Sequence, residues 1–214
     1  MTRFNPDMLR CYLVGGSQDT NHDPQQLLDD VDQALQAGIT MFQYREKGSS
    51  RLSAQEKLSL GQQLMHLCRQ HDVPFIIDDD VALAQQLGAD GVHVGQDDEK
   101  IQQVIAQVGS QMMVGYSCST QAEVQRANHL GVDYVGSGPV YPTMSKADAD
   151  PVIGVDGLTK LVETSWHPIV AIGGIAEDNL QHVASSHCSG VATISMILQS
   201  DDIGATVRHV LNVF

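Results

Sequence analysis

The sequence predicts an α/β protein whose 214 residues form one domain, a single (β/α)8 barrel or TIM barrel spanning 1–214. Short apolar segments alternate strictly with longer segments of helical pattern, which is typical of a parallel sheet. The alternation repeats eight times, as a closed barrel requires, in a chain near the lower length limit for that fold. An open doubly wound sheet is the alternative, but the first strand lacks a GxGxxG turn into a helix.

The expected strands are short runs of apolar, mostly β-branched residues, as in strands buried on both faces of a sheet. In chain order they are CYLVGG (11–16), MFQYREK (41–47), FIIDD (75–79), GVHVG (91–95), MMVGYSC (112–118), YVGSGPV (134–140), IVAIGG (169–174) and GVATISMI (190–197).

The expected helices lie between these strands and carry apolar residues at helical spacing. Gly38, Gly88 and Gly131 are expected just past three helix C-termini, where glycine readily adopts the left-handed conformation. In chain order the helices are 24–38, 53–71, 81–88, 98–109, 120–131, 155–165, 176–186 and 201–214.

Composition excludes several classes of protein. A formal net charge of −14 argues against a nucleic-acid surface, which is normally basic. No apolar run approaches the roughly 20 residues of a membrane helix, so no membrane association is expected. Four scattered cysteines lack metal-binding spacing and predict reduced thiols and a cytoplasmic location. A homo-oligomer is left open.

Charged and amide side chains follow the second strand. Gln43, Arg45 and Lys47 alternate along it, so all three are expected on one side. Two cations and an amide directed into a barrel mouth would bind an anion. The alternative is a solvated strand end with Glu46 as the partner of these cations.

Carboxylates follow the third and fourth strands. Asp80 is expected to cap the next helix, while Asp78 and Asp79 are expected to point to opposite sides of the strand. Neighbouring strands lie about 4.8 Å apart, so one of these carboxylates and Asp98 could share a hard cation such as Mg²⁺ with phosphate oxygens. Helix capping is the alternative. His93 is expected in a core layer of the barrel.

The remaining strand ends carry small polar residues. Ser117 suits phosphate binding or helix capping, and the loop 136–146 is longer than a simple connection requires. Barrels frequently bind phosphate with backbone N–H groups after the seventh and eighth strands, here near Gly174 and Ser195. Two anion-binding regions are therefore expected.

Seven motifs together resemble the thiamine-phosphate synthase family. Each is weak alone, but their order and spacing over nearly the whole chain are specific. The motifs are QYREK (43–47), DDDVALA (78–84), GADGVHVGQDD (88–98), GYSCST (115–120), GSGPVYPTMSK (136–146), PIVAIGGI (168–175) and VATISMI (191–197).

The resemblance implies a transferase that joins 4-amino-2-methyl-5-(diphosphooxymethyl)pyrimidine to 4-methyl-5-(2-phosphooxyethyl)thiazole, releasing pyrophosphate and thiamine phosphate. It also implies that Arg45, Lys47 and Lys146 are catalytic and that Asp79 and Asp98 bind Mg²⁺. The residues that it assigns to the pyrimidine diphosphate are Gln43, Tyr44, Arg45, Glu46, Lys47, Asp78, Ser117 and Lys146. Those that it assigns to the thiazole phosphate are Thr143, Met144, Ser145, Gly174, Ile194 and Ser195.

Two positions depart from the family pattern. Asp78 stands where the family generally has Asn, and is expected to turn away, pair with Arg45 or join the metal shell. Ser145 replaces the usual Thr and keeps its hydroxyl. The loop 139–150 is expected to close as a lid that excludes water.

Three other functions are possible for a barrel of this kind. A thiazole tautomerase paralogue would carry a His where Ser119 stands and would lack the GQDD acid pair. A catalytically silent phosphate-binding barrel is not excluded by fold alone. A sugar-phosphate isomerase or epimerase would need a positioned general base, and nothing near His93 in the sequence supports that role.

Overall fold

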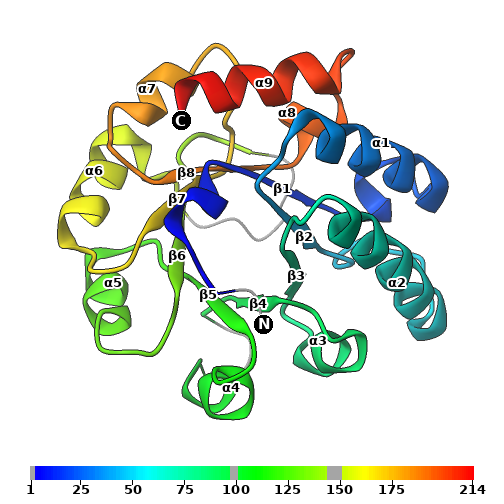
Figure 1. The fold of residues 1–214 in the computed structure, drawn as a ribbon. Coiled ribbons are helices and arrows are strands. Elements are labelled where there is room, and N and C mark those ends of the chain that lie inside the picture. The colour runs from blue at the N-terminus through cyan, green and yellow to red at the C-terminus, as the bar shows by residue number, and fades with distance from the viewer. Residues whose placement is uncertain (1–2, 97–100, 144–150) are drawn as a thin grey trace.

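The eight predicted strands close into a parallel barrel. The computed structural model describes residues 3–96, 101–143 and 151–214. Each strand pairs with the next, and β8 pairs back with β1, so that the ring has no edge (Figure 1). In chain order the strands are β1 (Cys11–Gly15), β2 (Met41–Tyr44), β3 (Phe75–Asp78), β4 (Gly91–Val94), β5 (Met113–Ser117), β6 (Tyr134–Ser137), β7 (Ile169–Ile172) and β8 (Gly190–Thr193).

Helices surround this ring on its outer face (Figure 1). They are α1 (Pro24–Ala37), α2 (Ala54–Gln70), α3 (Val81–Leu87), α4 (Ile101–Val108), α5 (Gln121–Ala127), α6 (Gly154–Thr164), α7 (Leu180–Ala184), α8 (Ser195–Leu198) and α9 (Ile203–Val213). Two short 3-10 helices, η1 (Pro6–Leu9) and η2 (Ser17–Asp19), flank β1. The (β/α)8 fold is therefore confirmed.

Local sequence explains where several helices begin and end. The Asp80 carboxylate accepts a hydrogen bond from Leu83 N at 2.8 Å and caps α3, as predicted. Gly38 and Gly88 end α1 and α3 with φ of 100° and 67°, also as predicted. The expectation for Gly131 is wrong, because α5 already ends at Ala127.

The last strand is shorter than predicted. The expected segment 190–197 ends as strand at Thr193, where pairing with β1 stops, and α8 begins at Ser195. Ile197 and Leu198 are buried on this short helix. A short apolar run suits a buried helix as well as a buried strand, so the pattern alone could not separate the two.

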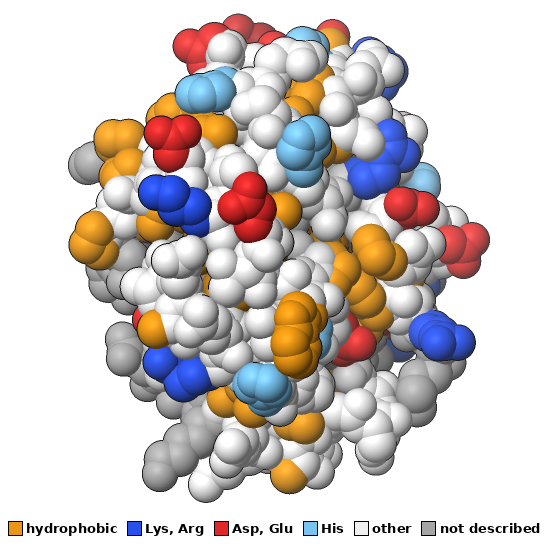
Figure 2. All heavy atoms as spheres, turned by 90° about the vertical axis from the view of Figure 1, so that its left-hand side faces the viewer, with side chains coloured by type: hydrophobic (Ala, Val, Ile, Leu, Met, Phe, Trp, Pro, Cys, Tyr) orange, Lys and Arg blue, Asp and Glu red, His pale blue; other side chains and the backbone are white. Residues whose placement is uncertain are grey.

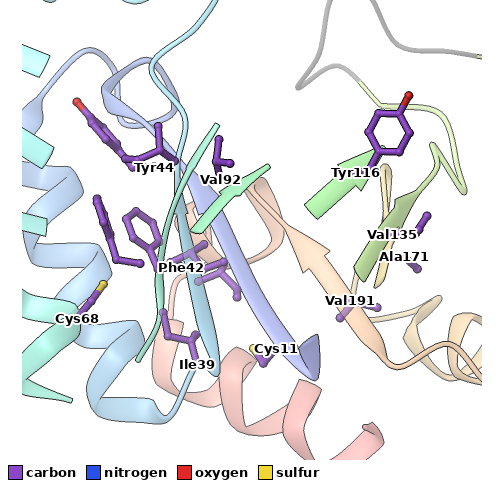
Figure 3. Packing of buried hydrophobic residues seen from close by; sticks show 14 of the residues in the cluster. Cys11, Ile39, Phe42, Tyr44, Cys68, Val92, Tyr116, Val135, Ala171 and Val191 are labelled. Carbon is purple, nitrogen blue, oxygen red and sulfur yellow. The ribbon is translucent and has the colours of Figure 1, made fainter. Parts of the chain in front are cut away.

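Two apolar cores lie on the two faces of the sheet. One lies between the sheet and the helices, where Phe42 and Tyr44 of β2 pack near Cys68 of α2 (Figure 3). The other fills the barrel interior, because alternate side chains of each strand point inward. Its fully buried members are Leu9, Tyr12, Val14, Met41, Ile76, Met113, Tyr134, Val170 and Ala192.

The N-terminal segment covers one end of the barrel. The Phe4 ring stacks on Tyr134, with 5.8 Å between ring centroids, and Met8 packs against the interior core. In Figure 1 this dark blue segment runs across the ring of strands. Since it precedes β1, it covers the N-terminal ends of the strands and leaves the C-terminal ends for a pocket.

The charged surface and the state of the cysteines can be compared with what the composition predicts. On the face formed by α5 and α6, basic and acidic side chains are interspersed (Figure 2). Within residues 3–96, 101–143 and 151–214, no helix is long and apolar enough to cross a bilayer. All four cysteines are free and buried.

Candidate active site

A pocket opens at the C-terminal ends of the strands, and all eight strands contribute to its lining. This is where barrel enzymes place their chemistry. The residues assigned from motifs that line it are Gln43, Arg45, Lys47, Asp78, Asp79, Ser117, Thr143, Gly174, Ile194 and Ser195. Four others, Asp98, Met144, Ser145 and Lys146, lie outside the described residues.

One part of the pocket, the charged side, consists of Arg45, Lys47, Asp78 and Asp79. Arg45 Nε lies 3.3 Å from Asp78 Oδ2, and these side chains are only 14% and 11% exposed. Lys47 Nζ contacts Asp79 Oδ2 directly. Of the three alternatives weighed for Asp78, the described structure shows the pair with Arg45. Each cation therefore has a carboxylate partner from the end of β3.

The direction in which the Asp79 side chain points differs from the prediction. Asp78 and Asp79 were expected on opposite sides of the strand, but both line the pocket. The reason is that β3 ends at Asp78, and Asp79 adopts a left-handed backbone with φ of 57°. Asp79 N donates to His93 O at 2.8 Å, and Gly95 N donates to Asp79 Oδ1 at 3.3 Å. These bonds hold its carboxylate toward the pocket.

Two members of the QYREK motif do not line the pocket. Tyr44 is only 1% exposed and points outward, because neighbouring strand residues face opposite sides; its hydroxyl lies 3.3 Å from the carbonyl oxygen of Lys57. Glu46 accepts hydrogen bonds from the hydroxyls of Ser17 and Ser50. Glu46 is thus occupied by neighbouring loops and is not the partner of the strand-end cations in the described structure.

Backbone contacts hold the segment that carries the two cations, although β2 has ended at Tyr44. Arg45 N donates to Gly15 O at 2.9 Å, and Gln18 Nε2 donates to Arg45 O at 2.7 Å. Lys57 Nζ donates to Glu46 O at 3.0 Å. The predicted strand through 47 is therefore too long, but the three residues Gln43, Arg45 and Lys47 still share the pocket, as their spacing suggested.

The floor of the pocket contains three residues that were not predicted as site residues: Tyr12, His93 and Tyr134. Tyr12 and His93 line the pocket, and Tyr134 is fully buried with its hydroxyl in contact with both. Burial raises the pKa of both phenols, and the Asp78 carboxylate raises each pKa further. Both tyrosines are therefore neutral. His93 is more than a core-layer residue, because it borders the pocket and binds the hydroxyl of Ser117.

The opposite part of the pocket, the glycine side, consists of Gly173, Gly174, Ile194 and Ser195. Gly173 and Gly174 have φ of 96° and 64°, which side chains rarely adopt. A Cβ on Gly174 would lie 2.5 Å from the carbonyl oxygen of Pro142. Only glycine fits here, and it leaves the backbone accessible from the pocket.

Further contacts shape the glycine side. The loop after β6 runs along the end of β7, since Val140 N donates to Ile172 O and Tyr141 N to Gly173 O, each at 3.0 Å. Thr193 also contributes to the lining, but its hydroxyl is buried, with no hydrogen-bond partner among the described residues.

The donor set near β3 suits a hard cation. Mg²⁺ prefers carboxylate and phosphate oxygens and takes only one or two carboxylates from a protein. Asp79 presents such oxygens to the pocket, next to Asp78. No cluster of three or more His, Cys, Asp or Glu occurs in the part of the chain that the structure describes. Asp98 lies outside this part, as do residues 144–150 of the expected lid.

Comparisons with known proteins agree on one family. The family model described as thiamine monophosphate synthase matches residues 11–197. The chain is 54% identical over 211 residues to the thiamine-phosphate synthase of Limosilactobacillus fermentum, covering 99% of each. It is 45% identical over 207 residues to that of Listeria monocytogenes, covering 95% of this chain and 96% of the relative.

The chain belongs to the thiamine monophosphate synthase family.

A solved structure of the same family supports the fold. Thiamine phosphate pyrophosphorylase from Pyrococcus furiosus superposes with a TM-score of 0.86 at 31% identity, covering 97% of this chain and 96% of that one. The expected activity, a thiamine-phosphate synthase and hence a transferase of thiamine biosynthesis, is confirmed by these relatives. The roles of single residues stay predictions.

Proposed function

We propose that the pocket joins the pyrimidine diphosphate to the thiazole phosphate by a dissociative displacement, within one catalytic domain over 1–214. The observation that supports this most is the division of one pocket into a charged side and a glycine side. A diphosphate needs several cations, whereas a monophosphate can be bound by backbone N–H groups. The two sides thus suit the two substrates.

The diphosphate would bind on the charged side. Arg45 and Lys47 are already paired with Asp78 and Asp79, so each cation would exchange a carboxylate contact for a phosphate oxygen. Because the Arg45–Asp78 pair is largely buried, this exchange happens where charges interact strongly. Asp79 and Asp98 are the residues that would hold Mg²⁺. When bound, Mg²⁺ supplies positive charge that neutralises the diphosphate oxygens.

The displacement breaks one bond and forms one. The bond between the pyrimidine CH₂ and the diphosphate oxygen breaks, and the electron pair leaves with pyrophosphate. The electron-rich aminopyrimidine spreads the positive charge of the CH₂ group, and the thiazole nitrogen then donates its lone pair to form the new C–N bond. Arg45, Lys47 and Lys146 would stabilise the charge that grows on the leaving group, which is commonly the largest contribution to catalysis.

The thiazole phosphate would bind on the glycine side. Gly174 exposes its backbone there, and Ser195 and Thr143 line the same region. This arrangement would hold the thiazole nitrogen facing the CH₂ group, while the bound substrates exclude water from the cation.

A direct assay tests the proposal. Purified protein is mixed with both substrates and Mg²⁺, and thiamine phosphate is followed through its fluorescent oxidation product. We expect product that depends on Mg²⁺ and is lost with EDTA and in Asp98→Asn. Asp178→Asn, a change at an exposed position outside the pocket, is the matched control and should keep full activity.

The rival functions predict other results. A tautomerase would isomerise its thiazole substrate and form no thiamine phosphate. A silent barrel would bind thiazole phosphate without any turnover. Either result from folded protein would overturn the proposal, as would full activity of Asp98→Asn.

A further inference from the structure

Five side chains form one hydrogen-bonded chain across the pocket floor, which we call the floor chain. It runs from β2 through β1, β6 and β4 to β5. In order, its members are Gln43, Tyr12, Tyr134, His93 and Ser117. Gln43 Nε2 lies 2.8 Å from the hydroxyl of Tyr12, which lies 2.9 Å from that of Tyr134. His93 Nδ1 lies 3.2 Å from the Tyr134 hydroxyl, and His93 Nε2 lies 3.0 Å from Ser117 Oγ.

Two glycines make room for the floor chain. Gly115 pairs in register with His93 on one side and with Tyr134 on the other. A Cβ there would lie 2.3 Å from Tyr134 Cζ and 2.4 Å from His93 Nδ1. A Cβ on Gly136 would lie 3.0 Å from His93 Cε1. The two rings can therefore meet over strand β5 only because these positions lack side chains.

The chemistry of the donors gives the floor chain a direction. The Gln43 amide nitrogen can only donate, so the hydroxyl of Tyr12 accepts from it. The single hydrogen of Tyr12 is then donated to Tyr134, the other hydrogen-bond partner of that hydroxyl in the described structure. In the reverse direction, Tyr12 would accept twice, and its own hydrogen would meet neither partner.

The same direction continues to the far end. Tyr134 donates its single hydrogen to His93 Nδ1, so the imidazole proton is on Nε2. His93 Nε2–H then donates to Ser117 Oγ. Because Ser117 Oγ accepts this bond, its own hydrogen stays available to donate into the pocket. At the opposite end, Gln43 keeps its carbonyl oxygen available as an acceptor.

We infer that Tyr12, Tyr134 and His93 are positioning residues that make Gln43 an acceptor and Ser117 a donor toward the pyrimidine diphosphate. This inference rests on the proposed function for the identity of that substrate. An acceptor at Gln43 suits the exocyclic amino group of the pyrimidine, and a donor at Ser117 suits a phosphate oxygen. With its Nε2 bound to Tyr12, the Gln43 amide keeps its oxygen as the acceptor, because turning the amide over would bring that oxygen to the Tyr12 hydroxyl and reverse the floor chain.

The floor chain therefore sets a specificity. A pyrimidine with a 4-oxo group in place of the 4-amino group presents an acceptor to the Gln43 oxygen, and buried groups that cannot pair discriminate strongly. Tyr12→Phe removes the acceptor that holds Gln43, so the amide becomes free to rotate. Discrimination between the amino and oxo compounds should then fall, although Phe preserves the packing.

The first test measures the direction of the hydrogen bonds in the floor chain and needs no catalytic turnover. The ¹⁵N shifts of the His93 ring, assigned by comparison with His93→Gln, report which nitrogen carries the proton. We expect the proton on Nε2 in the wild type and a mixture of tautomers in Tyr134→Phe. Tyr116→Phe is the control, since Tyr116 is also buried but belongs to the outer core and does not line the pocket. A wild-type proton on Nδ1, or equal changes in both variants, would overturn the inference.

The second test measures discrimination as the ratio of two inhibition constants. The inhibitors are unreactive 4-amino and 4-oxo pyrimidine diphosphates in which CH₂ replaces the ester oxygen. We expect the preference for the amino compound to fall by about tenfold in Tyr12→Phe and to stay unchanged in Tyr116→Phe. If turnover is normal and Tyr12→Phe keeps the wild-type ratio, the inference fails. If no turnover occurs at all, the proposed function is wrong. The tautomer of His93 then still tests whether the hydrogen bonds of the floor chain have the inferred direction.

Discussion

The charged side and the glycine side of the pocket are suited to bind anions for different physical reasons. On the charged side, Arg45 and Lys47 are held by carboxylates that must be exchanged when a ligand arrives. On the glycine side, backbone conformation alone shapes the surface, because Gly173 and Gly174 adopt left-handed φ values. Activity should therefore be sensitive to changes of charge on the charged side and to changes of shape on the glycine side.

The difference also fits the proposed chemistry. Charge grows on the diphosphate as it leaves, so groups that strengthen their interaction during the reaction belong beside it. The thiazole phosphate keeps its charge throughout and needs only to be held. Loss of a charged-side residue should mainly lower kcat, whereas distortion of the glycine side should mainly raise one KM.

The largest expected effect is on the charged side, in Lys47→Ala. Removal of a preorganised charge next to a leaving group lowers kcat by roughly 10²–10³-fold, and the KM for thiazole phosphate should change little. Steady-state kinetics with each substrate varied in turn would measure both. Lys160→Ala, at an exposed position on α6, is the control. Equal losses in both variants would show that the effect is not specific to the pocket.

A smaller effect is expected for Asp79→Asn. The change removes a proposed Mg²⁺ ligand and the partner of Lys47, so Mg²⁺ should bind on the order of 10–100-fold more weakly. A titration of activity against Mg²⁺ would show this as a shifted midpoint that high Mg²⁺ restores. An unchanged midpoint would remove Asp79 from the metal site.

On the glycine side, Gly174→Ala tests shape. Its Cβ would lie 2.5 Å from Pro142 O at a φ of 64°, so we expect a loss of roughly 1–3 kcal/mol in the free energy of unfolding. The KM for thiazole phosphate should rise on the order of tenfold, because one misplaced N–H removes about 1.4 kcal/mol of binding.

Gly131→Ala is the control for this change, since the nearest atom to its Cβ would lie 3.4 Å away. Urea unfolding and kinetics on both variants would separate stability from binding. A larger rise in the KM for the pyrimidine diphosphate would mean that the two sides are assigned the wrong way round.

The smallest expected effect is for Asp78→Asn. The amide oxygen of Asn can still accept a hydrogen bond from Arg45. Activity should stay within about threefold, less than about 1 kcal/mol in the barrier, because Arg45 would exchange this contact for a phosphate oxygen when the diphosphate binds. The measurement is the kcat of Asp78→Asn, compared with the kcat of Asp79→Asn. A loss as large as that of Asp79→Asn would give the Asp78 carboxylate a role of its own.

Much of this protein could be predicted from its sequence. Strict alternation of apolar strands and amphipathic helices predicted the closed barrel, because each local pattern is compatible with few other arrangements. The spacing of Gln43, Arg45 and Lys47 predicted that they would share one pocket, which the structure confirms. Asp80 was correctly predicted as a helix cap, because its hydrogen bond depends only on local geometry.

Other features depend on where each strand stops. Asp79 faces the pocket because β3 ends one residue earlier and its backbone turns left-handed. Tyr44 and Glu46 were assigned to the site by motif, yet they lie outside the pocket lining. Adjacent positions in a motif share a sequence, but side chains on a strand alternate between its two faces.

The floor chain shows most clearly what tertiary structure decided. Tyr12 and Tyr134 are 122 positions apart in the sequence, and their hydroxyls lie 2.9 Å apart in the barrel. The trace of the floor chain in the sequence is glycine at 115 and 136, whose meaning depends on the register of β4, β5 and β6. The sequence by itself determined the elements, their order and the reactive residue types. Closure of the sheet decided which of those residues meet, because it alone sets the register between distant strands.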